Sequence, residues 1–367
     1  MDTVKVLRCL RQAPGTTVHV LSTDRRSCVR FSRHCARFHY HSSQNDDDWI
    51  GTIEKIVRPW KIDVVLPATL RGIRLISQRS EAISRICAIP PVPKSDLLEL
   101  ANNKWSLYQL AKQHALPVVP SVLIRKTGGP ITDSQDLNSI EYPALLKPTS
   151  MRGGFGIVKV DRPSDLHGAW SDKRIMKDSE YILQSLVPAV DLSLAVFCKS
   201  GEVLAYTLWR ELVPSKKPFR MPQLVEYTDD EQALDVGKRL LSEIGWDGVA
   251  NIDLVFDKRD KTVKILEVNP RFWQSLLGSL TAGVNFPLMA CLSALGAECP
   301  DMRQTPRLRY ARPAASFQML LSRLVGKGPA ADFRWRDSGF RFIYTDPLPE
   351  LAHVLRATVS RIRRAFG

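Results

Sequence analysis

The sequence predicts a mixed α/β protein that is built from more than one domain. Its 367 residues exceed the length of about 100–200 residues that is typical of one domain. The first 100 residues alternate between helical and β patterns, whereas short strands and turns dominate from residue 117 onward. Hydrophobic residues make up 44% and charged residues 25% of the chain, which excludes collagen-like and wholly disordered proteins.

The N-terminal elements follow one another as helix, strand, helix, strand and helix. Helical patterns cover residues 4–10, 52–60 and 71–84, and β-branched or apolar runs cover residues 17–21 and 62–66. A continuous apolar run such as IDVVL is typical of a strand that is buried on both faces of a parallel sheet. We therefore predict half of a doubly wound α/β domain here.

A Pro-Pro-Val-Pro run at residues 90–93 marks the end of this domain. Two helices are predicted next, one beginning at Asp96 and one over residues 103–114. Further strands are predicted over residues 142–148, 157–160, 181–186, 192–198, 203–209, 249–256 and 262–269, and further helices over residues 229–244 and 351–366.

Charge and cysteine content narrow the class of protein. There are 52 Lys and Arg against 38 Asp and Glu, a net charge of +14, which favours an anionic partner: nucleic acid, anionic lipid or a phosphorylated small molecule. The seven cysteines include no Cys-x-x-Cys pair, and the N-terminus has no apolar signal region, so we expect a cytoplasmic protein. The uncharged stretch at residues 272–297 contains Gln274, Asn285 and Pro287, and is therefore predicted to form buried helices rather than a membrane span.

A glycine-rich turn lies between two of the predicted strands. Residues 150–156 read Ser-Met-Arg-Gly-Gly-Phe-Gly, and Lys147 precedes them. Glycines allow backbone N–H groups to approach phosphate oxygens closely, and a lysine neutralises their charge. The motif is neither a P-loop nor a dinucleotide-binding fingerprint, and an ordinary hairpin turn remains an alternative.

A second motif lies on the hairpin formed by the last two predicted strands. Glu267 and Asn269 are two residues apart and therefore share one face of a strand, and Asp253 on the partner strand can face the same way. Two carboxylates and an amide oxygen suit Mg²⁺ held together with phosphates, and Arg271 can grip a phosphate or carboxylate. The alternative is a solvated hairpin face with a charge pair.

Together these motifs resemble the ATP-grasp enzymes of the carboxylate–amine ligase type, and the chain is similar to single-chain relatives of the carbamoyl-phosphate synthase large subunit. The resemblance covers about residues 60–300. It is carried by ILEVNPRFWQSL at 265–276, AGVNFP at 282–287, YPALLKPTSMRGGFGIVKV at 142–160, NKWSLYQLAKQHALPVVPSVLI at 103–124 and YILQSLVPAVDLSLAVFCKSGEVLA at 181–205.

The resemblance implies an ATP-grasp fold, in which two α+β subdomains grip ATP, preceded by a degenerate Rossmann-like pre-ATP-grasp domain. The expected division is a pre-ATP-grasp domain at residues 1–95, an ATP-grasp domain at 96–300 and a basic C-terminal extension at 301–367. The fold normally opens on a central strand, whereas this sequence opens on a helix, which implies either that the sequence begins late or that this strand is missing.

The resemblance also implies a role for each residue that matches a family motif. Those assigned to ATP are Lys104 and Lys147 at the phosphates, Gly153, Gly154 and Gly156 in the mobile loop, Gln184 with the backbone of Ser185 and Val187 at adenine, and Asp191 at the ribose. Those assigned to one or two Mg²⁺, or to Mn²⁺ in their place, are Asp253, Glu267 and Asn269. Arg271 and Lys147 are assigned to catalysis.

The implied activity is an ATP- and Mg²⁺-dependent ligation of a small-molecule carboxylate to an amine through an acyl phosphate, with release of ADP and phosphate. Two alternatives stay open: a non-catalytic ATP-binding regulatory module of the same fold, and a nucleic-acid-binding protein, for which no reader motif is present. The sequence departs from the family at Gln184, where relatives have an acid, and at residues 214–218, a Pro-Ser-Lys-Lys-Pro turn that suits an anionic substrate. The basic amphipathic helix at residues 351–366 either docks on the body or makes a weak contact with an anionic membrane.

Overall fold

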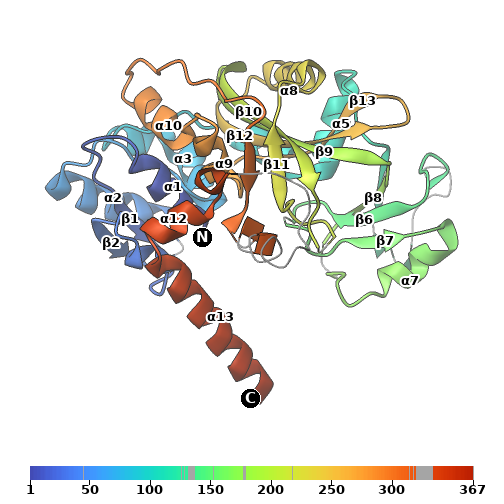
Figure 1. The fold of residues 1–367 in the computed structure, drawn as a ribbon, viewed down its shortest axis with the longest axis horizontal. Coiled ribbons are helices and arrows are strands. Elements are labelled where there is room, and N and C mark those ends of the chain that lie inside the picture. The colour runs from blue at the N-terminus through green and yellow to red at the C-terminus, as the bar shows by residue number, and fades with distance from the viewer. Residues whose placement is uncertain are drawn as a thin grey trace.

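A computed structural model describes the chain at residues 1–43, 45–124, 126–127, 129–130, 137–151, 153–176, 179–216, 218–313, 315–316, 318–319 and 334–366. An N-terminal α/β region, a large central sheet and a smaller sheet follow one another across the molecule (Figure 1). The C-terminal helix projects away from this body (Figure 1).

The N-terminal region is α/β as predicted, with a smaller sheet than expected. It contains α1 (Asp2–Leu10), β1 (His19–Ser22), η1 (Cys28–Phe31), β2 (Arg37–Tyr40), α2 (Asp46–Trp60) and α3 (Leu70–Ser84). β1 and β2 pair in parallel. The prediction of a strand at residues 62–66 is wrong, since only Val64 forms a single parallel bridge, to Ala88. Pro67 lies three residues after Val64, and Pro90 and Pro91 lie two and three residues after Ala88. Because proline has no N–H to donate, the pairing of these two segments does not extend beyond the single bridge.

Helix α2 begins six residues before the predicted start at residue 52. Asn45 caps it by accepting a hydrogen bond from the Asp47 N–H at 2.8 Å. Asp46, Asp47 and Asp48 then occupy the first turn, where negative charge complements the helix dipole.

The smaller sheet follows two helices, α4 (Ser95–Asn102) and α5 (Lys104–Gln113). Its strand order is β3-β8-β6-β7, made of β3 (Ser121–Ile124), β6 (Ala144–Pro148), β7 (Val158–Val160) and β8 (Tyr181–Ser185). Beside it lie β4 (Lys126–Thr127), β5 (Gly129–Pro130), η2 (Pro163–Asp165) and α7 (Leu166–Trp170). The two strands that flank the glycine-rich turn, β6 and β7, are those predicted.

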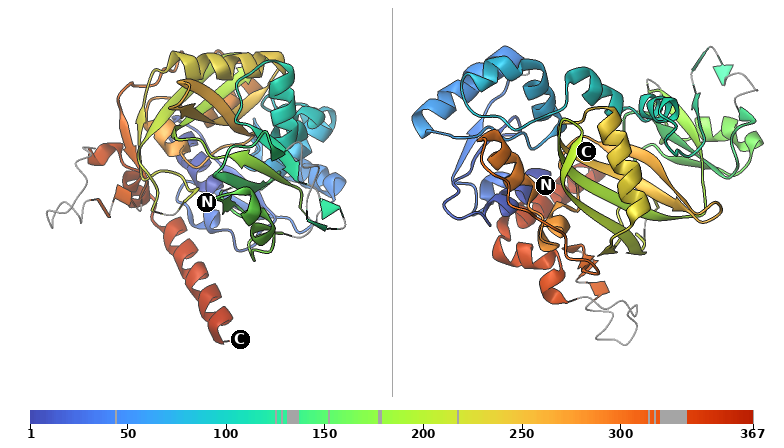
Figure 2. Two further views of the ribbon diagram at one scale, coloured as in Figure 1. Left: turned by 90° about the vertical axis from the view of Figure 1, so that its right-hand side faces the viewer. Right: turned by 90° about the horizontal axis from the view of Figure 1, so that it is seen from above.

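The central sheet is antiparallel and has the strand order β13-β12-β9-β10-β11-β14. Its strands are β9 (Ala189–Lys199), β10 (Glu202–Val213), β11 (Leu224–Tyr227), β12 (Gly248–Asp257), β13 (Thr262–Asn269) and β14 (Arg309–Ala311). Along β9 the side chains alternate: Leu194 and Val196 belong to the hydrophobic core that includes α8 (Glu231–Glu243), and Ala195 and Phe197 belong to the core on the other face. Helices therefore cover both faces of the sheet (Figure 2).

The uncharged stretch at residues 272–297 forms core helices, as predicted. α9 (Leu276–Thr281) and α10 (Phe286–Ala294) pack with α1 against the central sheet, and Leu276 and Phe286 are fully buried. The chain ends in η3 (Trp335–Asp337), α12 (Phe340–Thr345) and α13 (Leu348–Phe366). Among the residues described, no helix combines the length and the apolar character that crossing a membrane requires.

Candidate active site

A cleft of about 990 Å³ is lined by residues of both sheets. Lys147 and Gln184 reach it from the smaller sheet, and Asp191 and Asp253 reach it from the central sheet. With one exception, Gly156, every residue assigned to the site from the sequence lines this cleft. Its volume suits a nucleotide-sized ligand.

The hairpin β12–β13 brings the predicted metal-binding side chains together. Asp253 and Glu267 are paired directly across the two strands. The Asn269 side-chain NH₂ donates to Asp253 Oδ2 and to Glu267 Oε1, each at 3.1 Å. Lys104 Nζ, at the start of α5, lies 2.9 Å from Glu267 Oε2 and donates to the Met151 carbonyl oxygen at 2.8 Å.

The two carboxylates differ in their affinity for a proton. Burial raises the pKa of Asp253 well above its usual value, and the nearby charge of Glu267 raises it further. Burial acts on Glu267 in the same direction, but the Lys104 ammonium outweighs it and brings the Glu267 pKa to about 2. The site therefore carries a firm negative charge at Glu267 beside a carboxyl group of higher proton affinity at Asp253, and a divalent cation bound here would compete with a proton on Asp253.

Two residues that the sequence analysis missed support Asp253. Ser193 Oγ donates to Asp253 Oδ1 at 3.2 Å, and the Asn251 side chain donates to the same oxygen at 2.9 Å. Asn251 could have been found, because it precedes Asp253 by two residues and so shares its face of the strand. Within the part of the chain that is described, no three Asp, Glu, His or Cys side chains converge on a metal position. Two carboxylates with an amide suit Mg²⁺, which takes its remaining ligands from water and phosphate.

The amide of Asn269 links this group to Arg271. Arg271 Nη2 donates to Asn269 Oδ1 at 2.9 Å, and Arg271 Nη1 donates to the Phe272 carbonyl oxygen at 3.0 Å. The amide oxygen of Asn269 thus faces the arginine, and its NH₂ faces the carboxylates. A role for Asn269 as a metal ligand requires this side chain to turn.

Lys147 lies on β6, opposite the carboxylates. Its Nζ donates to Gln184 Oε1 at 2.7 Å, and Gln184 Nε2 donates to Ser121 Oγ at 2.9 Å. Burial lowers the pKa of Lys147 to about 8, although the charge of Glu267 opposes the shift. The oxygen of Gln184 that was expected to accept from adenine already accepts from Lys147, which leaves its second lone pair for the adenine amino group.

The glycine-rich turn requires its glycines for conformational reasons. Gly153, Gly154 and Gly156 have φ of 68°, 70° and 71°, a region that side chains disfavour. A Cβ on Gly154 would also collide with the Phe219 carbonyl oxygen. Gly156 lies behind the cleft wall, where a Cβ would be 3.2 Å from Pro148. Arg152, in the middle of the motif, is outside the described residues.

The comparisons with known proteins agree with this geometry. A family model described as "ATP-grasp domain" matches residues 101–275. These residues form an ATP-grasp domain. The match ends at Ser275, six residues beyond the end of β13, and so includes every residue assigned to the site above.

Relatives of the ATP-grasp domain include two ligases. The chain is 24% identical to the D-alanine–D-alanine ligase of Phocaeicola vulgatus over 181 residues, which cover 46% of this chain and 54% of the ligase. It is 26% identical to the D-aspartate ligase of Enterococcus faecium over 230 residues, which cover 58% of this chain and 53% of the ligase. The chain therefore spans about half the length of each.

Solved structures confirm the fold over a longer range. The carboxyaminoimidazole ribonucleotide synthase of Aspergillus clavatus complexed with ATP superimposes with a TM-score of 0.63 and 16% identity, over 90% of this chain and 88% of that one. A biotin carboxylase of Campylobacter jejuni gives a TM-score of 0.60 and 16% identity, over 83% of this chain and 71% of that one. The predicted ATP-grasp fold is confirmed, and a pre-ATP-grasp N-terminal domain is consistent with these neighbours.

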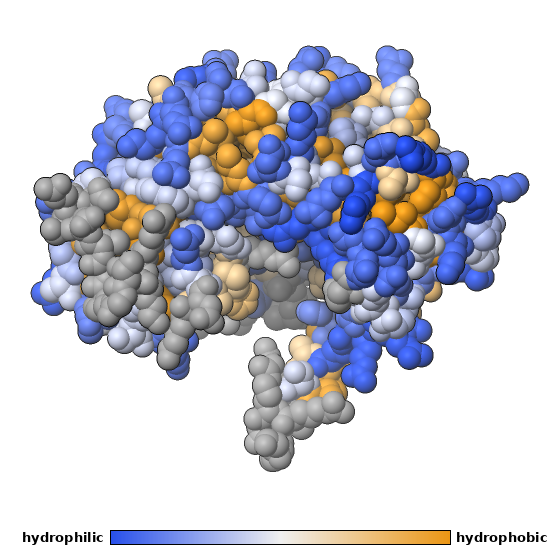
Figure 3. All heavy atoms as spheres, turned by 180° about the vertical axis from the view of Figure 1, so that it is seen from behind, coloured by the Kyte–Doolittle hydropathy of each residue, from blue (hydrophilic) through white to orange (hydrophobic). Residues whose placement is uncertain are grey.

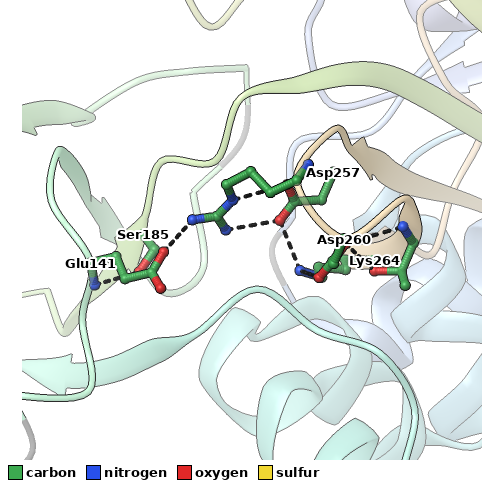
Figure 4. Close-up of polar contacts among 7 residues, drawn as sticks. Glu141, Ser185, Asp257, Asp260 and Lys264 are labelled. Atoms are coloured by element: carbon green, nitrogen blue, oxygen red, sulfur yellow. Dashed lines mark hydrogen bonds and ion pairs between the residues drawn. The ribbon is translucent and has the colours of Figure 1, made fainter.

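An ionic network links the two walls of the cleft in the ATP-grasp domain (Figure 4). Asp257, fully buried at the end of β12, is held by Arg259 and by Lys264, each at 2.8 Å, and hydrogen bonds to these groups lower its pKa. Arg259 also pairs with Glu141, whose backbone N–H donates to Ser185 Oγ at 3.0 Å. The network thereby positions Ser185 at the predicted adenine segment.

Within that segment, two backbone N–H groups are already used. Ser185 donates to the Pro120 carbonyl oxygen at 3.0 Å, and Leu186 donates to the Pro143 carbonyl oxygen at 2.8 Å. Val187 is largely buried at the cleft. Asp191 is exposed at the cleft surface. The protein atoms around its carboxyl group remove part of its hydration and raise its pKa, and the charge of Lys147 opposes this shift.

The cleft is also lined by residues that the sequence analysis did not assign. Glu211, Arg220 and Arg312 line it, together with the predicted Lys216. Arg312 follows β14, which the C-terminal region contributes to the edge of the central sheet. Lys217, the second lysine of the predicted anion-binding turn, lies outside the described residues.

Proposed function

We propose that this protein is an ATP- and Mg²⁺-dependent ligase that joins a carboxylate to an amine. In the first step a substrate carboxylate oxygen attacks the γ-phosphorus of ATP, which forms an acyl phosphate and expels ADP. In the second step an amine attacks the acyl carbon, so that an amide forms, phosphate leaves and the amine loses a proton.

One observation carries this function: six side chains that are assigned to phosphate and metal share one cleft, and five of them are joined by direct contacts. Lys104 pairs with Glu267, Asn269 bridges Glu267 and Asp253, and Arg271 is held by Asn269. Lys147 completes the set from the opposite wall. A module that only binds ATP needs fewer groups at the γ-phosphate.

In this function the chain's residues act mainly by position and charge. Lys104 and Lys147 neutralise the phosphate oxygens, and Arg271 stabilises the phosphoryl group as it is transferred. Asp253, Glu267 and Asn269 would hold Mg²⁺, which shields the charge that develops on the phosphates. Gly153 and Gly154 allow the backbone to approach the nucleotide closely.

The charged residues of the cleft that are not assigned to ATP or Mg²⁺ favour an anionic carboxylate substrate. Among them, Lys216, Arg220 and Arg312 outnumber Glu211. Arg312 Nε is buried and has no hydrogen-bond partner among the described residues, and a buried donor without a partner is costly. A second acidic group on the substrate would pair with the cations that line the cleft.

The direct test is a screen for ADP release with Mg²⁺, in which pooled carboxylates are combined with pooled amines. Amino acids are tested first, because two relatives are amino-acid ligases. We expect ADP and phosphate to form in equal amounts only when both substrates are present. Firm ATP binding without ADP release from any pair would instead support the non-catalytic module.

The affinity for ATP is expected to decrease by up to ~10-fold for each pH unit above about 8, as Lys147 loses its proton. Because its pKa in the free protein is about 8, the ammonium is present below that pH, and above it binding must take up a proton. Isothermal titration in two buffers of different ionisation enthalpy measures both the affinity and the proton uptake.

Two variants control for other causes of this pH dependence. Lys147→Arg keeps its charge at all these pH values, so its affinity should change little with pH. Lys147→Met should bind ATP weakly throughout. A wild-type affinity that stays constant up to pH of about 9.5 would contradict the assignment of Lys147 to the phosphates.

A further inference from the structure

The root of α13 is fixed to the N-terminal region by buried polar contacts. Arg8 is 4% exposed and donates twice to the Glu350 carboxylate and once to the Asp346 carbonyl oxygen, each at 2.7 Å. Ser32 Oγ donates to Asp346 Oδ2 at 2.7 Å. These contacts set the direction in which the helix leaves the body (Figure 1).

Beyond this root the helix exposes one apolar face. Leu348, Leu351, Val354, Leu355 and Val359 are 56%, 56%, 60%, 65% and 49% exposed. At 100° per residue these five side chains fall within an arc of about 140°. In the space-filling view the projecting helix exposes hydrophobic next to hydrophilic atoms (Figure 3). Such a face is normally covered, because exposed leucine and valine lose the free energy of burial.

The surroundings of this face are strongly basic. From Leu351 onward the chain has four arginines, 356, 361, 363 and 364, and no acidic residue. α13 packs against η1, and the segment of residues 25–37, which contains η1 and the first residue of β2, carries five further exposed arginines at 25, 26, 30, 33 and 37. We call this segment the arginine loop. Two exposed aromatic residues lie nearby in the chain: Phe31 in η1, and Tyr344 shortly before α13.

We propose that α13 and this arginine loop form a docking surface for an anionic membrane. The apolar face would lie at the boundary between headgroups and acyl chains, and the arginines would contact the phosphate and carboxylate groups of the lipids. This inference is independent of the ligase function, since neither element lines the cleft.

A second copy of the chain fits this face less well. Two such helices would bring their arginines together, and beyond Glu350 the helix has no carboxylate to pair with them. The apolar arc is also wider than the narrow seam of a two-stranded coiled coil. Charge complementarity therefore favours lipid.

The test is co-sedimentation of the full chain with vesicles of phosphatidylcholine, with or without phosphatidylserine. We expect at least ~10-fold tighter binding to the anionic vesicles, and weaker binding as salt is raised. The double variant Leu351→Asp with Leu355→Asp should lose at least ~10-fold in this binding, since it places two charges on the apolar face that would enter the membrane. Arg25→Ala with Arg30→Ala should reduce it several-fold and leave the binding to neutral vesicles unchanged.

The matched control is Leu295→Asp, which makes the same change at a leucine of 52% exposure after α10, away from α13. It should bind vesicles like the wild type. Equal binding to both kinds of vesicle would overturn the proposal. A dimer in light scattering that the Leu351/Leu355 variant dissociates, with no binding to lipid, would also overturn it and would assign the face to a second copy.

Discussion

Replacing Arg271 with alanine is expected to lower the rate of ADP formation by at least ~100-fold while ATP affinity stays within a few-fold of the wild type. Arg271 is held at the end of the hairpin by the Asn269 amide oxygen and the Phe272 carbonyl oxygen. A guanidinium fixed in this way stabilises the charge of the transferred group without reorganising first, and that advantage is largest in the transition state. Single-turnover ADP formation and ATP titration, with a substrate pair that works, separate the two effects.

Two further variants make the Arg271 result specific. Arg271→Lys keeps the charge but loses the two-pronged geometry, so an intermediate rate is expected. Arg210→Ala removes an arginine of the same sheet that pairs with Glu226 and does not line the cleft, and its rate should remain close to the wild type. If Arg271→Ala and Arg210→Ala have equal rates, Arg271 has no special role at the phosphoryl group.

The hairpin was predictable because its signal is local. Two alternating strands joined by a polar turn fix which side chains share a face, so the spacing of Glu267 and Asn269 was enough to bring them together with Asp253. The same reasoning failed at residues 62–66. There the apolar run is present, but it forms a strand only if a second segment pairs along its length. Its partner segment, which contains Ala88, is followed by prolines that limit the pairing to a single bridge.

Short edge strands escaped the sequence analysis for a related reason. β14 has three residues and pairs with β11, which lies far from it in the chain. Nothing in Arg309–Ala311 itself indicates that partner. The missed pairing also affects the description of the site, because Arg312, which lines the cleft, directly follows β14.

Contacts between the walls of the cleft were equally hidden. The family resemblance assigned Lys147 and Gln184 separate roles, whereas a 2.7 Å hydrogen bond joins them. Lys104 was assigned to the phosphates, and it pairs with Glu267. A sequence motif identifies which groups belong to a site, but it does not indicate which of them pair with and neutralise one another.

That neutralisation determines what a change at Glu267 should do. Glu267→Gln keeps the size of the side chain and its contact with Asn269. It removes the negative charge of Glu267, whose pKa Lys104 lowers to about 2. We expect turnover to fall by at least ~100-fold, equivalent to roughly 3 kcal/mol of lost electrostatic stabilisation. Without that charge, Mg²⁺ would be held too weakly to shield the γ-phosphate, whereas binding of the adenosine part near Gln184 to Asp191 should weaken much less.

Asn269→Asp provides the matched comparison, and the structure indicates how it should differ. The variant keeps an oxygen for Arg271 but loses the NH₂ that bridges Asp253 and Glu267, and it adds a third carboxylate beside them. Its melting temperature should therefore fall without Mg²⁺ and recover when Mg²⁺ and nucleotide are added, because like charges repel until a cation joins them. Its turnover should fall less than that of Glu267→Gln, since a carboxylate can still bind Mg²⁺. Steady-state ADP formation and thermal unfolding with and without Mg²⁺ decide the matter: a Glu267→Gln enzyme with nearly wild-type rates would remove the hairpin from the metal site, and with it the mechanism proposed for this cleft.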